Sequence, residues 1–413
     1  MNGKQLLLVW LVGLLLLVGL PFYFMGESAW RLWNIPVMLP SFADTRSILT
    51  GVQAQRLGYD PLIENPLDPF GRVMAYPRPW LLLGILPLSP ANTPLLAGIE
   101  IALFLVALFI FVDRLDRQAV PWIAAMLISP AVMLCFERGN TDLIAFFLLA
   151  AAIALLPRLP GLAVLVTELA AVLKLYPIIA LGMLLRQSKK AAALWLSAGL
   201  AVFALYAAFT WRDIQQVLAM ASKGVGFNYG ATVLGVWLWD LTGSARLAGA
   251  AFALCYLAAY LLLLSGLYRS YRDAPAFVIT NPRRLDAFRV GALLYVGTFL
   301  QGNTWNYRLI FLIFTVPQLV EWLRGEPSLW RRITRTTLAL ILLSAWAPLF
   351  GASEPPSASI PGVLQVLVDE LLNWSLLGAF SYILFVTLPE WIREQIALFF
   401  EKYSKPARAR SST

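Results

Sequence analysis

Residues 41–62 read SFADTRSILTGVQAQRLGYDPL and follow an apolar run, Leu6–Phe24, that is long enough to cross a membrane. The chain returns to apolar sequence through residues 74–80, MAYPRPW. The intervening segment, Glu27–Arg78, is long, aromatic-rich and of mixed charge. Channels and carriers rarely need such a loop, whereas an enzyme that acts at a membrane surface on a lipid-carried substrate does. The pattern predicts a large structured first outer loop.

The composition is that of an integral membrane protein. Of 413 residues, 60% are hydrophobic and only 13% are charged. Apolar runs recur along the chain, and no polar stretch is long enough for a separate soluble domain. We predict an all-α polytopic membrane protein with about 12 transmembrane helices. Residues 1–388 would form this domain, with 27–78 as its outer loop, and 389–413 a cytoplasmic amphipathic basic tail.

The distribution of basic residues predicts the orientation. The formal net charge is +9, and most of the 32 Lys and Arg residues fall on one side if the N-terminus is cytoplasmic. Both termini are then cytoplasmic in a multi-pass protein of the cell membrane, and residues 27–78 face outward. Topology accounts for the basic charge, so we expect no nucleic-acid partner.

Two absences narrow the chemistry. The chain has no His, which removes imidazole as a base or a metal ligand. Its two cysteines, Cys135 and Cys255, lie in apolar runs and are expected to be packed thiols. Carboxylates, Lys, Arg, Tyr and amides remain as functional groups.

Residues 161–185 allow two readings. They could form one helix with Lys174 near its middle, or two short helices that meet near Lys174–Pro177. Pro177 lacks a backbone donor and favours a break. Only an up-and-down pair keeps both Arg158 and Lys189 on the cytoplasmic side, so we favour the pair.

Three motifs resemble glycosyltransferase family 87 of the GT-C superfamily. They are ERGNTDLIAFFLLAAAIAL (137–155), LKLYPIIALGMLL (173–185) followed by RQSKK, and GNTWNYRLIFLIF (302–314). The likeness rests on their order and spacing, from the first helix to about Arg324. It implies a GT-C fold and an inverting transfer of a sugar, with mannose expected. The donor would be a polyprenyl monophosphate, and the acceptor a lipid or glycan on the outer face.

Asp44 is the candidate catalytic base under this resemblance. A polyprenyl phosphate is a good leaving group, so the chemical demand falls on deprotonating the acceptor hydroxyl, which one carboxylate can do. An inverting displacement needs no second, nucleophilic carboxylate, and no obvious one lies near Asp44 in the sequence. The alternative role is an N-cap of the helix expected over Asp44–Leu57. Arg46 could pair with Asp44 or reach a phosphate.

Lys174 is the candidate phosphate ligand within the membrane. A cation at membrane depth is costly unless it is paired or faces an aqueous cavity. At the junction of two short helices it could stabilise the negative charge of a departing phosphate. The alternative is a structural ion pair with Glu168 or Glu137.

Residues 137–142, ERGNTD, offer further polar groups at the outer end of two helices. Arg138 could bind the donor phosphate, because a guanidinium presents a planar fork of donors. Asn140 and Asp142 could hold sugar hydroxyls. Ordinary turn chemistry is the alternative, with Asp142 capping the next helix.

Residues 302–308 add a late motif. Arg308 is the preferred second phosphate contact, and Asn306 and Tyr307 could bind substrate. The neighbouring Trp305 is expected in the aromatic belt at the membrane interface.

We expect no required cofactor or metal, because Asp44 has no acidic neighbour one or two residues away. A divalent metal stays open, since Glu64 and Asp68 could bind one. Two functional alternatives also stay open: a lipid or solute carrier or flippase, and an inactive GT-C-like scaffold subunit.

Overall fold

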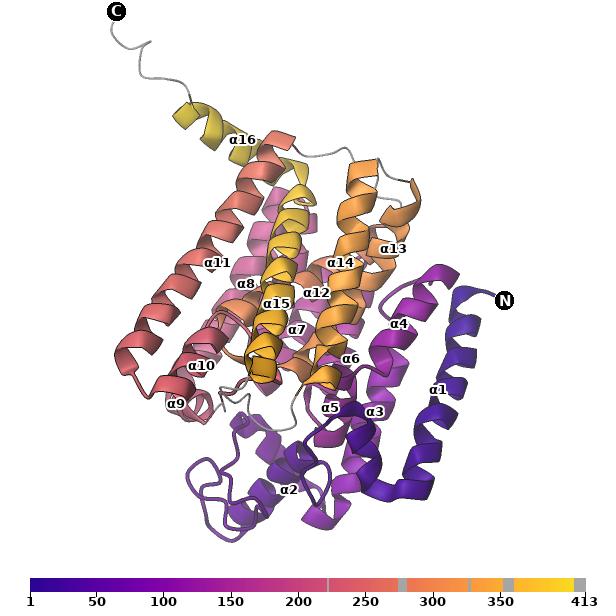
Figure 1. Ribbon diagram of the computed structural model, residues 1–413, viewed down its shortest axis with the longest axis vertical. Coiled ribbons are helices and arrows are strands. Elements are labelled where there is room, and N and C mark those ends of the chain that lie inside the picture. Colours follow the sequence, from indigo (N-terminus) through magenta and orange to yellow (C-terminus); the bar gives the residue numbers. More distant parts are fainter. Residues whose placement is uncertain (221–222, 274–280, 326–327, 352–359, 405–413) are drawn as a thin grey trace, which may run out of the picture.

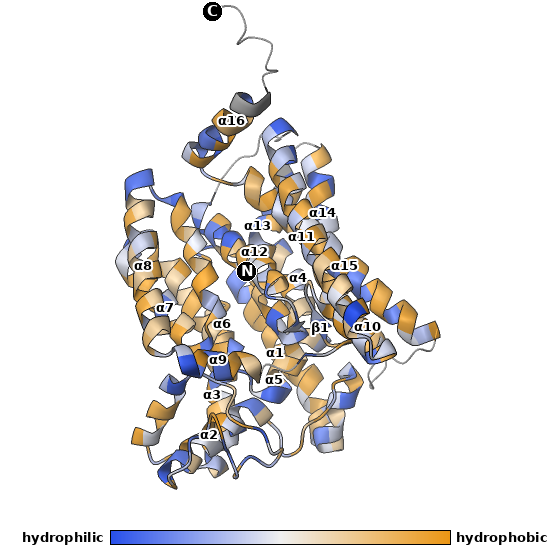
Figure 2. Cartoon of the chain, turned by 90° about the vertical axis from the view of Figure 1, so that its left-hand side faces the viewer, coloured by the Kyte–Doolittle hydropathy of each residue, from blue (hydrophilic) through white to orange (hydrophobic). Residues whose placement is uncertain are grey.

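The computed structural model describes residues 1–220, 223–273, 281–325, 328–351 and 360–404. Its helices run mostly lengthwise through one bundle (Figure 1). The last helix, α16 (Glu390–Ser404), lies at one end, α2 (Ala43–Arg56) lies at the other, and the N-terminus lies at the side of the bundle. Apolar residues colour much of the bundle, and polar residues gather toward its ends (Figure 2).

Six helices among the described residues are long and apolar enough to cross a membrane. They are α1 (Gly3–Met25), α3 (Thr93–Ala107), α8 (Lys189–Phe209), α11 (Ala245–Asp273), α14 (Ser328–Trp346) and α15 (Ile360–Val386). If the bent pair of α4 (Val120–Leu127) and α5 (Pro130–Arg138) is counted as one span, the described residues contain up to seven candidate membrane spans. The polytopic all-helical class is therefore present, while the expected count of about 12 is not confirmed, because the other apolar segments are short.

The 57° bend between α4 and α5 has a local cause. Pro130 has no N–H to donate, and Ser129 caps α5 by accepting a hydrogen bond from Val132 N. This bend directs the outer end of α5 toward α2, with which it makes contact.

Residues 161–185 form two short helices, as the favoured reading predicted. They are α7 (Pro160–Lys174) and η5 (Tyr176–Arg186), which is a 3₁₀ helix. The chain reverses at Leu175, whose φ of 66° lies in the left-handed region, and the two helices pack together. Lys174 therefore lies at the tip of a helical hairpin.

The first outer loop contains the helix expected there. Its elements are η1 (Gly26–Trp33) and α2, and the two 3₁₀ helices η2 (Arg78–Ile85) and η3 (Pro90–Asn92) follow it. The loop has a small core of its own, in which Ile48 and Val52 of α2 pack with Leu62, Met74 and Trp80. Burial of these side chains fixes the start of α2 against the bundle.

Two distant segments join in a short antiparallel ribbon. β1 (Asn228–Tyr229) pairs with β2 (Thr304–Trp305), so the fold carries one small β element beside its helices. The remaining helices are η4 (Arg117–Ala119), α6 (Asp142–Leu155), α9 (Trp211–Ala219), α10 (Val233–Thr242), α12 (Pro282–Leu300), η6 (Asn306–Thr315), α13 (Val316–Gly325) and η7 (Ala347–Phe350).

The tail begins as the helix α16, which sits beside the end of α11 (Figure 1). Residues 405–413, which carry part of the predicted basic charge, lie outside the described residues. So do residues 352–359.

Candidate active site

Asp44 lies in the first turn of α2, and its carboxylate points away from that helix toward two other segments. Oδ2 accepts a hydrogen bond from Asn140 Nδ2 at 2.6 Å, and Oδ1 lies 3.4 Å from Arg72 Nη1. The N-cap position is Phe42, which has φ of 64°, and no side chain caps the helix. The N-cap reading of Asp44 is therefore wrong, because the helix already begins at Ala43.

Arg72, and not Arg46, is the cation that contacts Asp44. Arg72 also lies 3.4 Å from Asp68, so the two carboxylates share one guanidinium. Arg46 donates instead to the carbonyl oxygen of Ser41. The Asp44 side chain remains 14% exposed, so an acceptor hydroxyl can reach its carboxylate.

Asn140 joins Asp44 to Lys174. The Asn140 amide nitrogen donates to Asp44, and its Oδ1 accepts from Lys174 Nζ at 2.6 Å. Lys174 Nζ also donates to Thr141 Oγ1 at 2.9 Å and lies 3.0 Å from Asp142 Oδ1. The two structural partners considered for Lys174, Glu168 and Glu137, are both wrong, because the hairpin tip directs the ammonium to Asp142.

Asp142 extends the network to Tyr176 of η5 and, through its ring, to Arg308 of η6. Tyr176 donates to Asp142 Oδ1 at 2.6 Å, and the Arg308 guanidinium lies 4.4 Å from the Tyr176 ring centroid. Arg308 donates to Thr304 Oγ1 at 3.3 Å. Its Nε has no partner, and none of the described carboxylates lies within ion-pair distance. Arg308 is thus more available to an anion than Lys174, whose three donors are occupied.

Asp142 is the first residue of α6, and the N-cap position belongs to Thr141. The expected cap by Asp142 is therefore wrong, whereas Gly139 and Asn140 do form the turn between the two helices, with Asn140 Oδ1 accepting a hydrogen bond from Asp142 N. Asp142 Oδ2 is buried and unpartnered, which leaves an acceptor for a hydroxyl group.

Arg138 lies beside this network and not within it. Its Nη1 contacts Glu137 Oε2, and its Nη2 donates to the carbonyl oxygen of Pro36 at 2.9 Å. Glu137 also accepts from Met38 N, and its carbonyl accepts from Phe42 N at 3.0 Å. These contacts anchor the segment before α2, so a phosphate would have to compete with them for Arg138.

The late motif reaches the same region. The Tyr307 ring centroid lies 5.7 Å from Lys174 Nζ, and the ring stacks with Trp305. Asn306 donates its N–H to Phe227 O, and its buried Oδ1 has no partner. The ribbon thus holds Asn306 and Tyr307 near the tip of the hairpin.

Sequence reasoning missed four contributors: Arg72, Thr141, Tyr176 and Glu100. Glu100 of α3 accepts a hydrogen bond from Thr45, which also donates to Gly139 O. Tyr176 directly follows the Lys174–Leu175 reversal, which was the available signal for it. Nothing in the sequence joins Glu100 or Arg72 to Asp44, since these residues meet only through packing.

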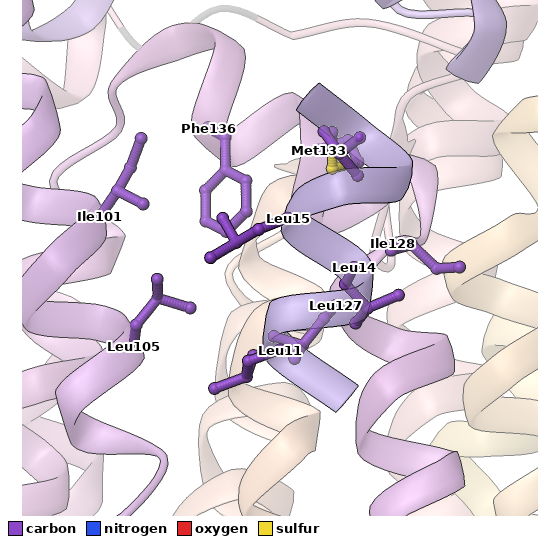
Figure 3. Close-up of a pocket in the computed structure, with 10 residues that line it drawn as sticks. Leu11, Leu14, Leu15, Ile101, Leu105, Leu127, Ile128, Met133 and Phe136 are labelled. Carbon is purple, nitrogen blue, oxygen red and sulfur yellow. The ribbon is translucent and has the colours of Figure 1, made fainter. Parts of the chain in front are cut away.

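An apolar groove runs along the bundle near this network. Its volume is about 140 Å³, and residues of α1, α3, α4 and α5 line it without a polar side chain (Figure 3). Phe136 is one of the lining residues, and the next residue, Glu137, contacts the segment before α2.

The model of glycosyltransferase family 87 matches residues 75–281, about half of the chain. The chain belongs to glycosyltransferase family 87. The matched region contains Asn140, Asp142 and Lys174, whereas Asp44 and Arg308 lie outside it. No curated protein and no solved structure matches the chain.

Membership makes the protein a transferase that moves a sugar from a donor to an acceptor, and its apolar helices make it a multi-pass membrane protein. The family therefore supports an enzyme and not the alternative of a lipid or solute carrier. Within the family 87 chain, the network supplies an accessible carboxylate, an ammonium and a guanidinium within a few hydrogen bonds of one another.

Proposed function

We propose that the protein is an inverting glycosyltransferase that takes a sugar, expected to be mannose, from a polyprenyl monophosphate. It transfers the sugar to a hydroxyl group of a lipid or glycan on the outer face of the membrane. One observation carries the proposal: a single amide, Asn140, bridges the Asp44 carboxylate and the Lys174 ammonium, with 2.6 Å on each side. These two hydrogen bonds hold a proton acceptor and a cation that can stabilise a phosphate at a fixed distance from each other.

The reaction assigns one task to each group. Asp44 accepts the proton of the acceptor hydroxyl while that oxygen bonds to the anomeric carbon. The bond from this carbon to the phosphate oxygen breaks, and polyprenyl phosphate leaves with the bonding electrons. Arg308 and Lys174 stabilise the charge on the departing phosphate, with Arg138 as a further contact.

The sugar would lie between these groups. The unpartnered oxygens of Asp142 and Asn306 can accept hydrogen bonds from sugar hydroxyls, and the Asn140 amide and the Tyr307 ring border the same space. Buried acceptors without partners favour a ligand that donates to them.

The apolar groove supports a lipid-linked donor. A polyprenyl chain is purely apolar, and the groove between α1 and α3 offers it a matching apolar surface (Figure 3). A soluble nucleotide-sugar donor would have no use for this surface.

We include the orientation of the chain across the membrane in this proposal. If the segments α6, α7, η5, α12 and η6 also cross the membrane, the seven spans identified by length and composition become 12, the expected number. Both termini are then cytoplasmic, and α2 and the network face outward.

We also propose that no divalent metal is required, because Lys174 and Arg308 provide the positive charge that a metal would supply at a phosphate. Sugar transfer measured with excess chelator tests this point. Activity lost with chelator and restored by added Mg²⁺ or Mn²⁺ would overturn it.

The test of the function is sugar transfer by purified Asp44→Asn, with polyprenyl-phosphate mannose as donor. Asparagine keeps the size and can still bond to Asn140, but it cannot accept a proton usefully near neutral pH. Loss of a general base costs on the order of 100- to 10,000-fold in rate. We expect a loss of that size with unchanged thermal stability.

Asp60→Asn is the matched control, because Asp60 lies in the same outer loop and pairs with Arg78 away from the network. It should retain transfer. An active Asp44→Asn would end the assignment of the base, and a wild-type protein inactive with every donor tested would favour the scaffold alternative. Replacing mannose with glucose or galactose on the same polyprenyl phosphate tests the sugar.

A further inference from the structure

A second cavity lies at the other end of the bundle, where α16 begins (Figure 1). It has a volume of about 380 Å³, which falls within the range of small-molecule sites. The end of η5, the first turns of α12, the end of α15 and the start of α16 meet around it. It shares no lining residue with the network around Asp44.

Arginines dominate the polar lining. Arg186, Arg289 and Arg393 face the cavity, together with two carboxylates, Asp286 and Glu390. Asp286 is buried and paired with Arg186, so the charges of these two residues offset each other. The remaining lining therefore carries more positive than negative charge.

Arg289 is the buried cation of this lining. It is only 7% exposed, and its Nη2 donates to the carbonyl oxygen of Thr387, which is a neutral acceptor. None of the described carboxylates lies within ion-pair distance of Arg289, and the Asp286 carboxylate that attracts it is paired with Arg186. One carboxylate thus serves two guanidinium groups, and an anion in the cavity would offset the remaining positive charge.

The mixed lining indicates the class of anion. Leu285, Leu388 and Pro389 provide apolar surface beside the guanidinium groups. Arginine matches phosphate oxygens with two parallel donors, and apolar walls at a membrane surface suit the part of a lipid next to its headgroup.

We propose that this cavity binds a phosphate group, carried by an anionic lipid headgroup or free in solution. Arg289 is its buried ligand, and Arg393 of α16 is its exposed ligand. The site would tie the position of α16 to the phosphate content of the membrane surface, independently of sugar transfer.

The test measures thermal stabilisation of the full chain, purified in detergent, by two probes. One is short-chain phosphatidic acid, with phosphatidylcholine as the neutral comparison. The other is inorganic phosphate, with chloride at equal ionic strength. Arg289→Gln and Arg393→Gln should each weaken binding by about tenfold or more, because each removes a charge-assisted hydrogen bond.

Arg335→Gln is the matched control, since Arg335 is an exposed arginine of α14 that does not line the cavity. It should bind as the wild type does. If only phosphatidic acid stabilises the protein, the phosphate group in the cavity belongs to a lipid headgroup. If inorganic phosphate stabilises it equally, the ligand is free phosphate.

The proposal fails if neither probe stabilises the wild type, or if Arg393→Gln binds as Arg335→Gln does. If Arg289→Gln does not fold, Arg393→Gln decides, because Arg393 is exposed and its loss leaves no buried group unpaired. Polyprenyl-phosphate mannose transfer by Arg393→Gln, expected to be unchanged, separates this site from the proposed active site.

Discussion

At the scale of the residue, the Lys174 ammonium is held by three oxygens and cannot be treated as an isolated charge. Asp142 lies 3.0 Å from Nζ, and both side chains are almost fully buried. Removing one partner of such a pair leaves an uncompensated charge, which typically costs about 3–5 kcal/mol, whereas removing both costs much less. This pairing decides how Lys174 is to be tested.

We predict that Lys174→Met lowers the free energy of unfolding by about 3–5 kcal/mol and abolishes sugar transfer. The double variant Lys174→Met/Asp142→Asn should recover most of the stability, because no buried charge is left alone. Thermal unfolding and transfer are measured on the same preparations.

The double variant separates the two roles of Lys174. If Lys174 binds phosphate, the stable double variant stays inactive and the concentration of donor needed for half-maximal rate rises in Lys174→Arg. A stable double variant with wild-type transfer would make Lys174 a structural residue only.

At the scale of the element, the turn between α5 and α6 sets the distance between Asp44 and Asn140. Gly139 occupies the left-handed region at φ of 54°, and a Cβ there would lie 2.4 Å from Thr45 Oγ1. Thr45 belongs to the first turn of α2 and donates to the Gly139 carbonyl. The close approach of these two elements therefore requires glycine.

We predict that Gly139→Ala destabilises the protein by more than about 1–2 kcal/mol, the usual cost of a left-handed non-glycine residue, because a steric clash is added to it. Transfer should fall as well, since α2 must move away from Asn140. Gly58→Ala is the control: Gly58 also has positive φ, 90°, but open space around its Cβ. Equal effects of the two substitutions would contradict the close-packing explanation.

A second contact at this scale joins the outer loop to α9. Arg78 lies 2.7 Å from both Asp60 of the loop and Asp213 of α9. The hydrogen bond from Arg78 holds the pKa of Asp60 below its ordinary value. A lowered pKa in the folded state gives stability that is present above the ordinary pKa and lost as the pH falls through the folded value.

We therefore predict that Asp60→Asn is less stable than the wild type near neutral pH, by at most about 1 kcal/mol because the pair is partly exposed. The difference should shrink as the pH falls below the ordinary pKa of an aspartate and vanish only below the lowered pKa of the folded state, where the wild-type Asp60 is protonated as well. Thermal unfolding of both proteins across this range checks the sign. A difference that persists unchanged at the lowest pH would rule out the charge of Asp60 as its origin.

At the scale of the whole molecule, the proposed active site and the basic cavity lie at opposite ends of the bundle. We predict that a cysteine at Tyr59 in the outer loop reacts with a membrane-impermeant maleimide from outside. A cysteine at Lys190, just after η5, should react only after permeabilisation. The native Cys135 and Cys255 are buried, which keeps the background low. Labelling of both positions from one side would contradict the hairpin of α7 and η5 as a pair of crossings.

The sequence by itself determined the membrane class, the helix of the outer loop to within one residue at each end, the break beside Lys174 and the family. These features depend on apolar run length, on proline's missing donor and on the order of short motifs, all of which are local along the chain.

Only the tertiary structure decided which polar groups meet. Asp44 and Asn140 are 96 positions apart, yet they lie 2.6 Å from each other. The sequence suggested a cap for Asp44 and Glu168 or Glu137 for Lys174, because local proximity was the available guide. In the folded chain Asp44 instead meets Asn140, and Lys174 meets Asp142. These contacts result from the bend before α5, the reversal at Leu175 and the packing of α2 on the bundle. A buried polar group bonds to whatever partner packing brings within reach, and sequence distance has no part in that choice.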